Sequence, residues 1–166
     1  SRPGVSDGKW LEVWNDVFMQ YNKQSDGSYT KLERKCVDTG MGIERTIAVL
    51  QGKKSVYDTE VFQPIIAAIE RVSGATYGGS ESEEDRSIRI IADHVRTATF
   101  ILGDEKAVTP SNVGQGYILR RLIRRAVRHG RKLGLEGPFL TEPAQEVLEI
   151  YTEPYPILDQ HRELIL

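Results

Sequence analysis

The chain has almost no cysteine and no long run of apolar residues. Its 166 residues include one cysteine, Cys36, which excludes an internal disulfide and fits the reducing cytoplasm that we expect as its location. No apolar stretch has the length needed to cross a bilayer, so we predict no membrane-spanning segment. The first residues have neither a signal-peptide pattern nor an initiator methionine, which leads us to expect a piece excised from a longer protein.

No charge of one sign dominates the chain either. The 22 lysines and arginines and 24 acidic residues give a net charge of −2, which would not by itself predict a nucleic-acid partner. With 39% apolar and 28% charged residues, the composition is that of a soluble globular protein of one domain or two small ones. The informative property is how the basic residues are distributed.

The segment from Ile118 to Leu133 has the period of an amphipathic helix with one apolar half and one basic half. The basic half contains no acid and consists of Arg120, Arg121, Arg124, Arg125, Arg128, Arg131 and Lys132. Like charges four residues apart repel, so this concentration favours a polyanionic partner, and the excess of arginine favours phosphate contacts. A merely solvated face and a membrane-surface helix are the two alternatives.

A change of pattern near Lys54 predicts two parts. Residues 10–22 and 29–37 are rich in aromatic and branched side chains, and Asp26-Gly27 between them is typical of a hairpin turn. Beyond Gly40 the helical period dominates. It predicts four helices, over about 41–50, 61–74, 87–102 and 118–133, and one or two more after Pro143. Ser87 would cap the third helix, and Gly74 would end the second. Pro64 either kinks the second helix or forms its first turn. Residues 77–85 read as an exposed loop, and the fold class is α+β.

The segment from Val37 to Arg45 combines the end of a predicted strand with two glycines and a charged helix start. Gly40 and Gly42 would let a flat ligand approach the backbone closely. Arg45 can hold a phosphate or carboxylate through two parallel hydrogen bonds, and Asp38 can hold a cationic amine. An ordinary strand–turn–helix has the same pattern, and Asp38 could then simply cap the helix.

Four segments occurring in this order resemble the alanyl-tRNA synthetases, a family of class II aminoacyl-tRNA synthetases. They are Leu11–Asn22, Val37–Arg45, Ile91–Ala98 and Pro110–Arg121. The resemblance implies an internal fragment: residues 1–54 would end the catalytic domain, with a hairpin of its antiparallel sheet and motif 3, and residues 55–166 would form an incomplete helical tRNA-recognition domain. Motifs 1 and 2 and the editing domain would lie outside the chain. A stand-alone RNA-binding module without enzymatic activity is the alternative.

The resemblance also implies roles for individual residues. The parent reaction would be the ATP-dependent attachment of alanine to its tRNA through an alanyl-adenylate, with Mg²⁺ assisting. Alanine would contact four residues, with Asp38 holding its ammonium group: Asn15, Val17, Asp38 and Gly40. ATP would contact Gly42 and Arg45, and Arg45 would be the catalytic residue at the γ-phosphate. Without motifs 1 and 2, we expect the fragment to be catalytically inactive but able to contact the tRNA.

Asn112 lies just before the basic helix. In the family this asparagine approaches the G·U wobble pair in the acceptor stem of tRNA(Ala), and an amide offers both a donor and an acceptor to base edges in a shallow RNA groove. This chain has Val113 and Gln115 where the family usually has Glu and Arg. Asn112 as a turn or cap residue is the alternative. The family's zinc site lies in its editing region, so we predict no metal in this chain, and the sequence does not indicate an oligomeric state.

Overall fold

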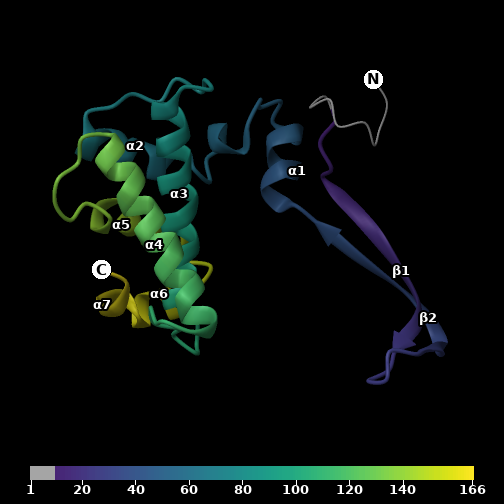
Figure 1. Ribbon diagram of the computed structural model, residues 1–166. Coiled ribbons are helices and arrows are strands. Elements are labelled where there is room, and N and C mark those ends of the chain that lie inside the picture. The colour runs from purple at the N-terminus through teal and green to yellow at the C-terminus, as the bar shows by residue number, and fades with distance from the viewer. Residues whose placement is uncertain (1–9) are drawn as a thin grey trace. The chain divides into compact units, whose positions relative to one another are not determined.

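The fold is known from a computed structural model, which describes residues 10–166. The chain divides after Lys54 into two compact units, Ser1–Lys54 and Ser55–Leu166, and residues 1–9 of the predicted first domain lie outside the described residues. The first unit holds a two-stranded antiparallel sheet and one helix, and the second is helical (Figure 1). The predicted α+β class is therefore confirmed.

The first unit is built on a long hairpin. Strands β1 (Trp14–Lys23) and β2 (Tyr29–Met41) pair antiparallel, and the Asp-Gly turn predicted from the sequence joins them. The Asp26 carboxylate accepts hydrogen bonds from the Ser28 amide (2.9 Å) and hydroxyl (2.7 Å), while Gly27 has a φ of 86°, which favours glycine.

The second strand is longer than the sequence pattern predicts. It continues through Met41, because Asp38 pairs with Val17 and Gly40 pairs with Asn15. Asp38 therefore lies inside a strand rather than at its end, and the chain turns at Gly42 rather than at Gly40. Helix α1 (Ile43–Leu50) follows, with Gly42 as its N-cap.

The hairpin buries few of its own side chains. All ten residues of β1 are exposed, and Phe18 on it is 73% exposed. A two-stranded ribbon with uncovered aromatic residues is at best marginally stable by itself. Its form therefore fits a sheet that further strands complete.

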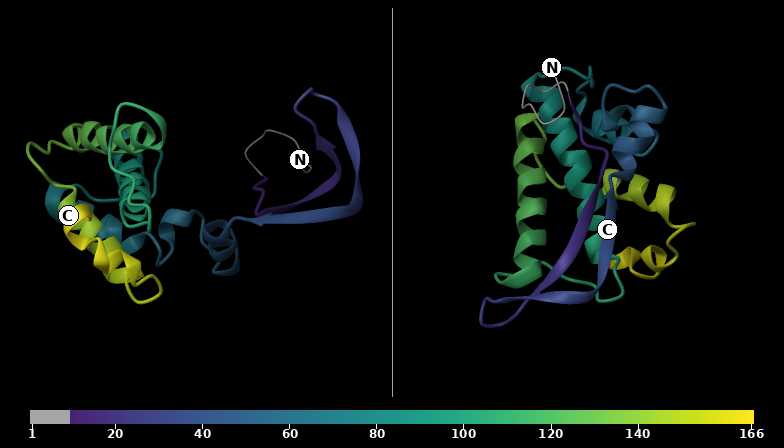
Figure 2. Two further views of the ribbon diagram at one scale, coloured as in Figure 1. Left: turned by 90° about the horizontal axis from the view of Figure 1, so that it is seen from below. Right: turned by 90° about the vertical axis from the view of Figure 1, so that its right-hand side faces the viewer.

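The second unit is organised around helix α3 (Glu83–Leu102), which packs against α2 (Gln63–Ser73), α4 (Gly114–Lys132) and α5 (Thr141–Tyr151). Figures 1 and 2 show α3 and α4 side by side. The centre of the core is fully buried and consists of Ile65, Ile69, Ile88, Ile91 and Val147. Within residues 10–166, no helix combines the length and apolarity that crossing a membrane requires.

The boundaries of α2 decide whether Pro64 kinks this helix or starts it. Pro64 lies in the first turn of α2, where its missing N–H has no helical acceptor to lose, so it starts the helix and does not kink it. Gly74 ends the helix in the left-handed conformation, with a φ of 71°. A short 3-10 turn, η1 (Val56–Asp58), precedes α2.

Helix α3 begins earlier than the sequence pattern predicts. Its N-cap is Ser82, whose hydroxyl accepts a hydrogen bond from the Asp85 amide (3.0 Å), and the predicted cap Ser87 is instead buried in the helix. Asp85 is only 2% exposed, and its carboxylate accepts hydrogen bonds from the amides of Gly78 (2.8 Å) and Ser80 (2.5 Å). The predicted exposed loop is thus tied down at one end by a buried carboxylate.

Three helices follow the basic segment, rather than the predicted one or two. They are α5, α6 (Ile157–Gln160) and α7 (Arg162–Ile165). Pro143 does not precede α5 but lies in its first turn, where proline is tolerated.

Candidate functional site

The residues predicted to bind alanine lie on two rungs of the hairpin that are separated by one other rung. Asn15 is opposite Gly40, and Val17 is opposite Asp38. Directly opposed residues of an antiparallel pair share a face, and residues two apart along a strand share it too, so all four belong to one face. Asp16 and Thr39, on the rung between, belong to the other face, where the Thr39 hydroxyl donates to the Asp16 carboxylate (2.7 Å).

This face has the chemistry of a small amino-acid site. It combines a carboxylate, an amide and a small apolar wall. Gly40 has no side chain on this face, and a Cβ there would be in ordinary contact with Asn15 Oδ1, at 3.7 Å. The alternative of Asp38 as a helix cap is not what the structure shows. The N-cap of α1 is Gly42, four residues further along, and no side chain caps it.

Arg45 is held by the backbone of the segment before β1. Its Nη1 donates to the carbonyl oxygen of Glu12 (2.8 Å), and the Glu12 carboxylate accepts from the side-chain Nδ2 of Asn15 (3.2 Å). A Cβ on Gly42 would lie 3.2 Å from Arg45 Cδ, so the glycine leaves room for the arginine. These contacts place Arg45 and Asn15 around one short segment of chain.

The described residues do not offer a ready site for Mg²⁺. Asp16 and Asp38 lie on opposite faces of the hairpin, as their pairing shows. Among residues 10–166, no group of three or more histidine, cysteine or acidic side chains is placed to hold a metal ion. We therefore assign no step to a metal within this chain.

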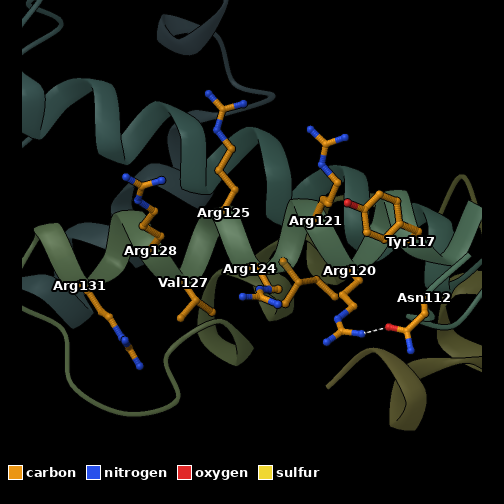
Figure 3. A pocket seen from close by; sticks show the side chains of 10 residues that line it. Asn112, Tyr117, Arg120, Arg121, Arg124, Arg125, Val127, Arg128 and Arg131 are labelled. Carbon is orange, nitrogen blue, oxygen red and sulfur yellow. Dashed lines mark hydrogen bonds between the residues drawn. The ribbon is translucent and has the colours of Figure 1, made fainter.

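The second candidate site is a groove along α4. It has a volume of about 810 Å³, and Figure 3 shows the side chains that line it. Asn112 and six of the predicted basic residues are among them, namely Arg120, Arg121, Arg124, Arg125, Arg128 and Arg131. The structure thus brings together all but one of the residues predicted to contact RNA, and we call these six arginines the basic face.

Asn112 lies at one end of the basic face. The Arg120 guanidinium donates a hydrogen bond to its side-chain oxygen (Figure 3). The N-cap of α4 is Val113 and not Asn112, so the cap alternative for Asn112 does not hold. Val113 contacts Ser111 through its backbone N–H and C=O. These bonds do not involve the side chain at position 113, so valine in place of the usual glutamate leaves them intact.

Lys132 is separate from the basic face. Its ammonium pairs with the Glu83 carboxylate of α3 at 3.0 Å, and this hydrogen bond is the main reason that the pKa of Glu83 is lowered. The lysine predicted to contact RNA is therefore already partly neutralised, which local sequence could not indicate because Glu83 is 49 residues away.

Tyr117 is a groove residue that the sequence analysis missed. The Arg121 guanidinium lies 5.8 Å from the centre of its ring, and Tyr117 is 45% exposed. Exposed aromatic rings beside arginines can stack on unpaired bases. The signal was present in the sequence, because Tyr117 precedes Arg121 by one helical turn.

The opposite side of α4 is buried against α3, with one polar contact that the sequence did not predict. Leu119 and Ala126 are almost fully covered, as predicted, whereas Ile118 is 50% exposed and lines a different groove. His129 Nδ1 lies 3.0 Å from the Ser87 hydroxyl of α3. Burial, and then the charges of Lys132 and nearby arginines, lower the pKa of His129.

Comparison with known proteins shows the family of this chain. Residues 1–166 match the family described as tRNA synthetases class II (A). An alanine–tRNA ligase of Treponema denticola is 62% identical over 165 residues, which is 99% of this chain and 27% of that protein. The alanine–tRNA ligase of Treponema pallidum is 60% identical over 96% of this chain and 26% of its own length. That of Anaeromyxobacter sp. is 49% identical over 95% of this chain and 17% of its own length.

The chain thus spans about a quarter of the length of the Treponema proteins that it matches. The match covers both units, the hairpin as well as the helical one. The chain belongs to the class II tRNA synthetases, and it is homologous to a segment of their alanine–tRNA ligase members.

Proposed function

We propose that this chain is part of a cytoplasmic alanine–tRNA ligase, which attaches alanine to its tRNA through an alanyl-adenylate formed from ATP. In that enzyme, residues 1–54 would end the catalytic domain and residues 55–166 would form part of the tRNA-recognition domain. One observation carries the proposal for the second unit: six arginines line one groove, and Asn112 lies at its end.

The spacing of the basic face suits a phosphate backbone. From Arg120 to Arg131 the helix advances about 16 Å, at about 1.5 Å per residue, and offers guanidinium groups at every turn. Guanidinium groups bind phosphate oxygens through paired hydrogen bonds, and neutralising phosphates releases counterions. We propose that the basic face lies along the acceptor stem and supplies affinity that does not depend on sequence.

Asn112 has a different role in this proposal. Phosphate contacts position a protein on a nucleic acid, whereas base-edge contacts discriminate between sequences. Asn112 is an exposed amide next to the row of arginines, so it can meet a base edge when the arginines meet phosphates. We assign it to the G·U pair of the acceptor stem.

For the first unit, we propose that the face carrying Asn15, Val17, Asp38 and Gly40 binds alanine. Asp38 would hold the ammonium group through charge-assisted hydrogen bonds, and Val17 would contact the methyl group. Gly42 and Arg45 would lie against ATP, with the Arg45 guanidinium at the γ-phosphate, where Mg²⁺ supplies further charge neutralisation in the complete enzyme.

The alternative is a stand-alone RNA-binding module. It predicts the same groove, but it gives the hairpin face no substrate to bind. The helical unit does have a core of its own. The hairpin matches the ligases together with the helices, which favours the enzyme.

Salt-dependent binding tests the role of the basic face. The chain should bind an acceptor-stem duplex, and the triple change Arg120→Ala, Arg124→Ala and Arg128→Ala should weaken binding to every such duplex. It should also reduce the slope of log affinity against log salt by about one unit or slightly less for each phosphate that the variant no longer neutralises. Arg71→Ala is the control, because Arg71 lies on α2 and pairs with Glu146 at 2.5 Å. An unchanged slope in the triple variant would contradict the proposal.

A further inference from the structure

The loop before α4 is bound tightly to the first turn of that helix. The Ser111 amide donates to the carbonyl oxygen of Gly116 (3.0 Å), which is inside the helix. The Ser111 hydroxyl donates to the carbonyl oxygen of Val113 (2.8 Å) and accepts from the Val113 amide (3.3 Å). Ser111 is half-buried, and these bonds fix the chain on both sides of the exposed Asn112.

This close approach depends on Gly116 having no side chain. Gly116 is buried, and a Cβ on it would lie 2.5 Å from the Ser111 hydroxyl oxygen and closer still to the carbonyl oxygen of Thr109. Carbon and oxygen atoms that are not bonded do not approach so closely, and the Thr109 oxygen belongs to the backbone, so it cannot rotate away. A side chain at this position requires the loop of residues 109–111 to move outward.

We infer that Gly116 and Ser111 are positioning residues, which set where Asn112 meets the acceptor stem. The inference rests on the proposed role of Asn112. It adds that Ser111 and Gly116 hold Asn112 in the place that this role requires. Asn112 directly follows Ser111, so an outward shift of the loop displaces the Asn112 backbone with it.

A small displacement is enough to affect base recognition. Hydrogen bonds weaken outside a donor–acceptor range of about 2.7–3.2 Å, so a shift of about half an ångström takes a base contact out of range. The arginines of the basic face are long, flexible and anchored on the helix itself. Arg120 also contacts the loop through Asn112, whereas the phosphate contacts of the other five arginines do not depend on the loop. Loss of discrimination with preserved affinity is therefore the signature of a positioning role.

The experiment uses the full-length ligase that contains this segment, with Gly116→Ala, Ser111→Ala and Asn112→Ala variants. For each, kcat/KM for charging is measured on acceptor stems with G·U and with G·C at the recognised pair, and the salt slope of RNA binding is measured separately. Alanine-dependent pyrophosphate exchange needs no tRNA and reports the amount of active enzyme. Gly130→Ala is the matched control, because a Cβ there would also clash, against the Phe139 ring at the other end of α4.

We expect Asn112→Ala to lower the G·U preference by about fivefold to a hundredfold, the scale of one good base contact in DNA. Gly116→Ala should produce most of that loss, and Ser111→Ala a smaller part of it, because its backbone bond to Gly116 persists. The salt slope should stay unchanged in all three. Gly130→Ala should leave the G·U preference as it is.

The inference fails if Asn112→Ala lowers the preference while both Gly116→Ala and Ser111→Ala retain it. It also fails if Gly130→Ala lowers the preference as much as Gly116→Ala does, because the effect would then be a general loosening of α4. A wild-type preference in Asn112→Ala would instead overturn the proposed function of Asn112. If Gly116→Ala does not fold, as shown by a loss of helical circular dichroism, Ser111→Ala decides. A lowered preference then supports the inference, and an unchanged one refutes it.

Discussion

The hydroxyl of Ser87 on α3 lies 3.0 Å from Nδ1 of His129 on α4, in a buried contact between residues 42 positions apart. One turn further along α4, Lys132 pairs with Glu83 on α3. These two contacts join the end of the basic helix to the start of its neighbour. They hold α4 by its inner side and leave the basic face on the outer side.

We expect the helical unit to lose stability in mild acid because of His129. Burial and the charges of Lys132, Arg125 and Arg128 lower the pKa of His129 below its ordinary 6.5. The unfolded chain therefore binds a proton that the folded chain excludes, and the free energy of unfolding falls as the pH drops through about 6.5 towards the folded-state pKa. The fall is at most about 1.4 kcal/mol per pH unit.

Urea unfolding of the chain at pH 7.5, 6.5 and 5.5 measures this effect. A His129→Gln variant should be less dependent on pH over this window, whereas His161→Gln, on a different part of the unit, should behave like the wild type. The same pH dependence in the wild type and in His129→Gln would show that other groups cause it.

Asp38→Asn in the full-length ligase should impair the use of alanine. The change removes the anionic partner of the substrate ammonium, and a hydrogen bond to a charged group contributes about 1.5–3 kcal/mol. The loss should be seen in kcat/KM for alanine in pyrophosphate exchange and hardly at all in the KM for ATP. Asp16→Asn is the matched control, since Asp16 lies one rung away on the opposite face. Unchanged alanine kinetics in Asp38→Asn would remove Asp38 from the site.

The chain by itself should not catalyse alanine-dependent exchange of pyrophosphate into ATP. The hairpin is uncovered, and Asp16 and Asp38 lie on opposite faces of it, so we expect the residues needed to hold ATP and Mg²⁺ to be incomplete here. The assay uses the purified chain beside the full-length ligase as the positive control. Exchange clearly above background would mean that the active site lies within these residues.

Asp85→Ala should destabilise the helical unit strongly. Burial of Asp85 would by itself raise the pKa of its carboxyl group, but the hydrogen bonds from Ser80 and Gly78 outweigh burial and lower that pKa. Removing the carboxylate removes the acceptor of both amides and of the Ser80 hydroxyl, and a hydrogen bond to a charged group contributes about 1.5–3 kcal/mol. Glu84→Ala is the control, because Glu84 is the adjacent exposed residue. Equal unfolding free energies for the two variants would contradict this account.

Much of what identifies this protein is local in the sequence. The hairpin turn follows from Asp26-Gly27, because one carboxylate and one positive φ suffice to close it. The row of arginines on one side of α4 follows from the helical period alone, since a helix places residues three and four apart on one side whatever surrounds it. The basic residues proposed to bind RNA could therefore be named from the helical period, whereas Asn112 was named from the family resemblance. The groove along α4 contains all of these residues except Lys132.

Tertiary structure decided the features that depend on distant residues. Strand β2 continues past Asp38 because β1 pairs with it there, which no local pattern in residues 37–41 indicates. Ser87 is a buried partner of His129 rather than a helix cap, and Lys132 pairs with Glu83, because α3 and α4 pack together. The close approach of Ser111 to Gly116 belongs to the same group, since it depends on how a loop folds back. Periodicity reports which side of an element is apolar, but the partner of a polar side chain is set by packing between segments that the sequence separates.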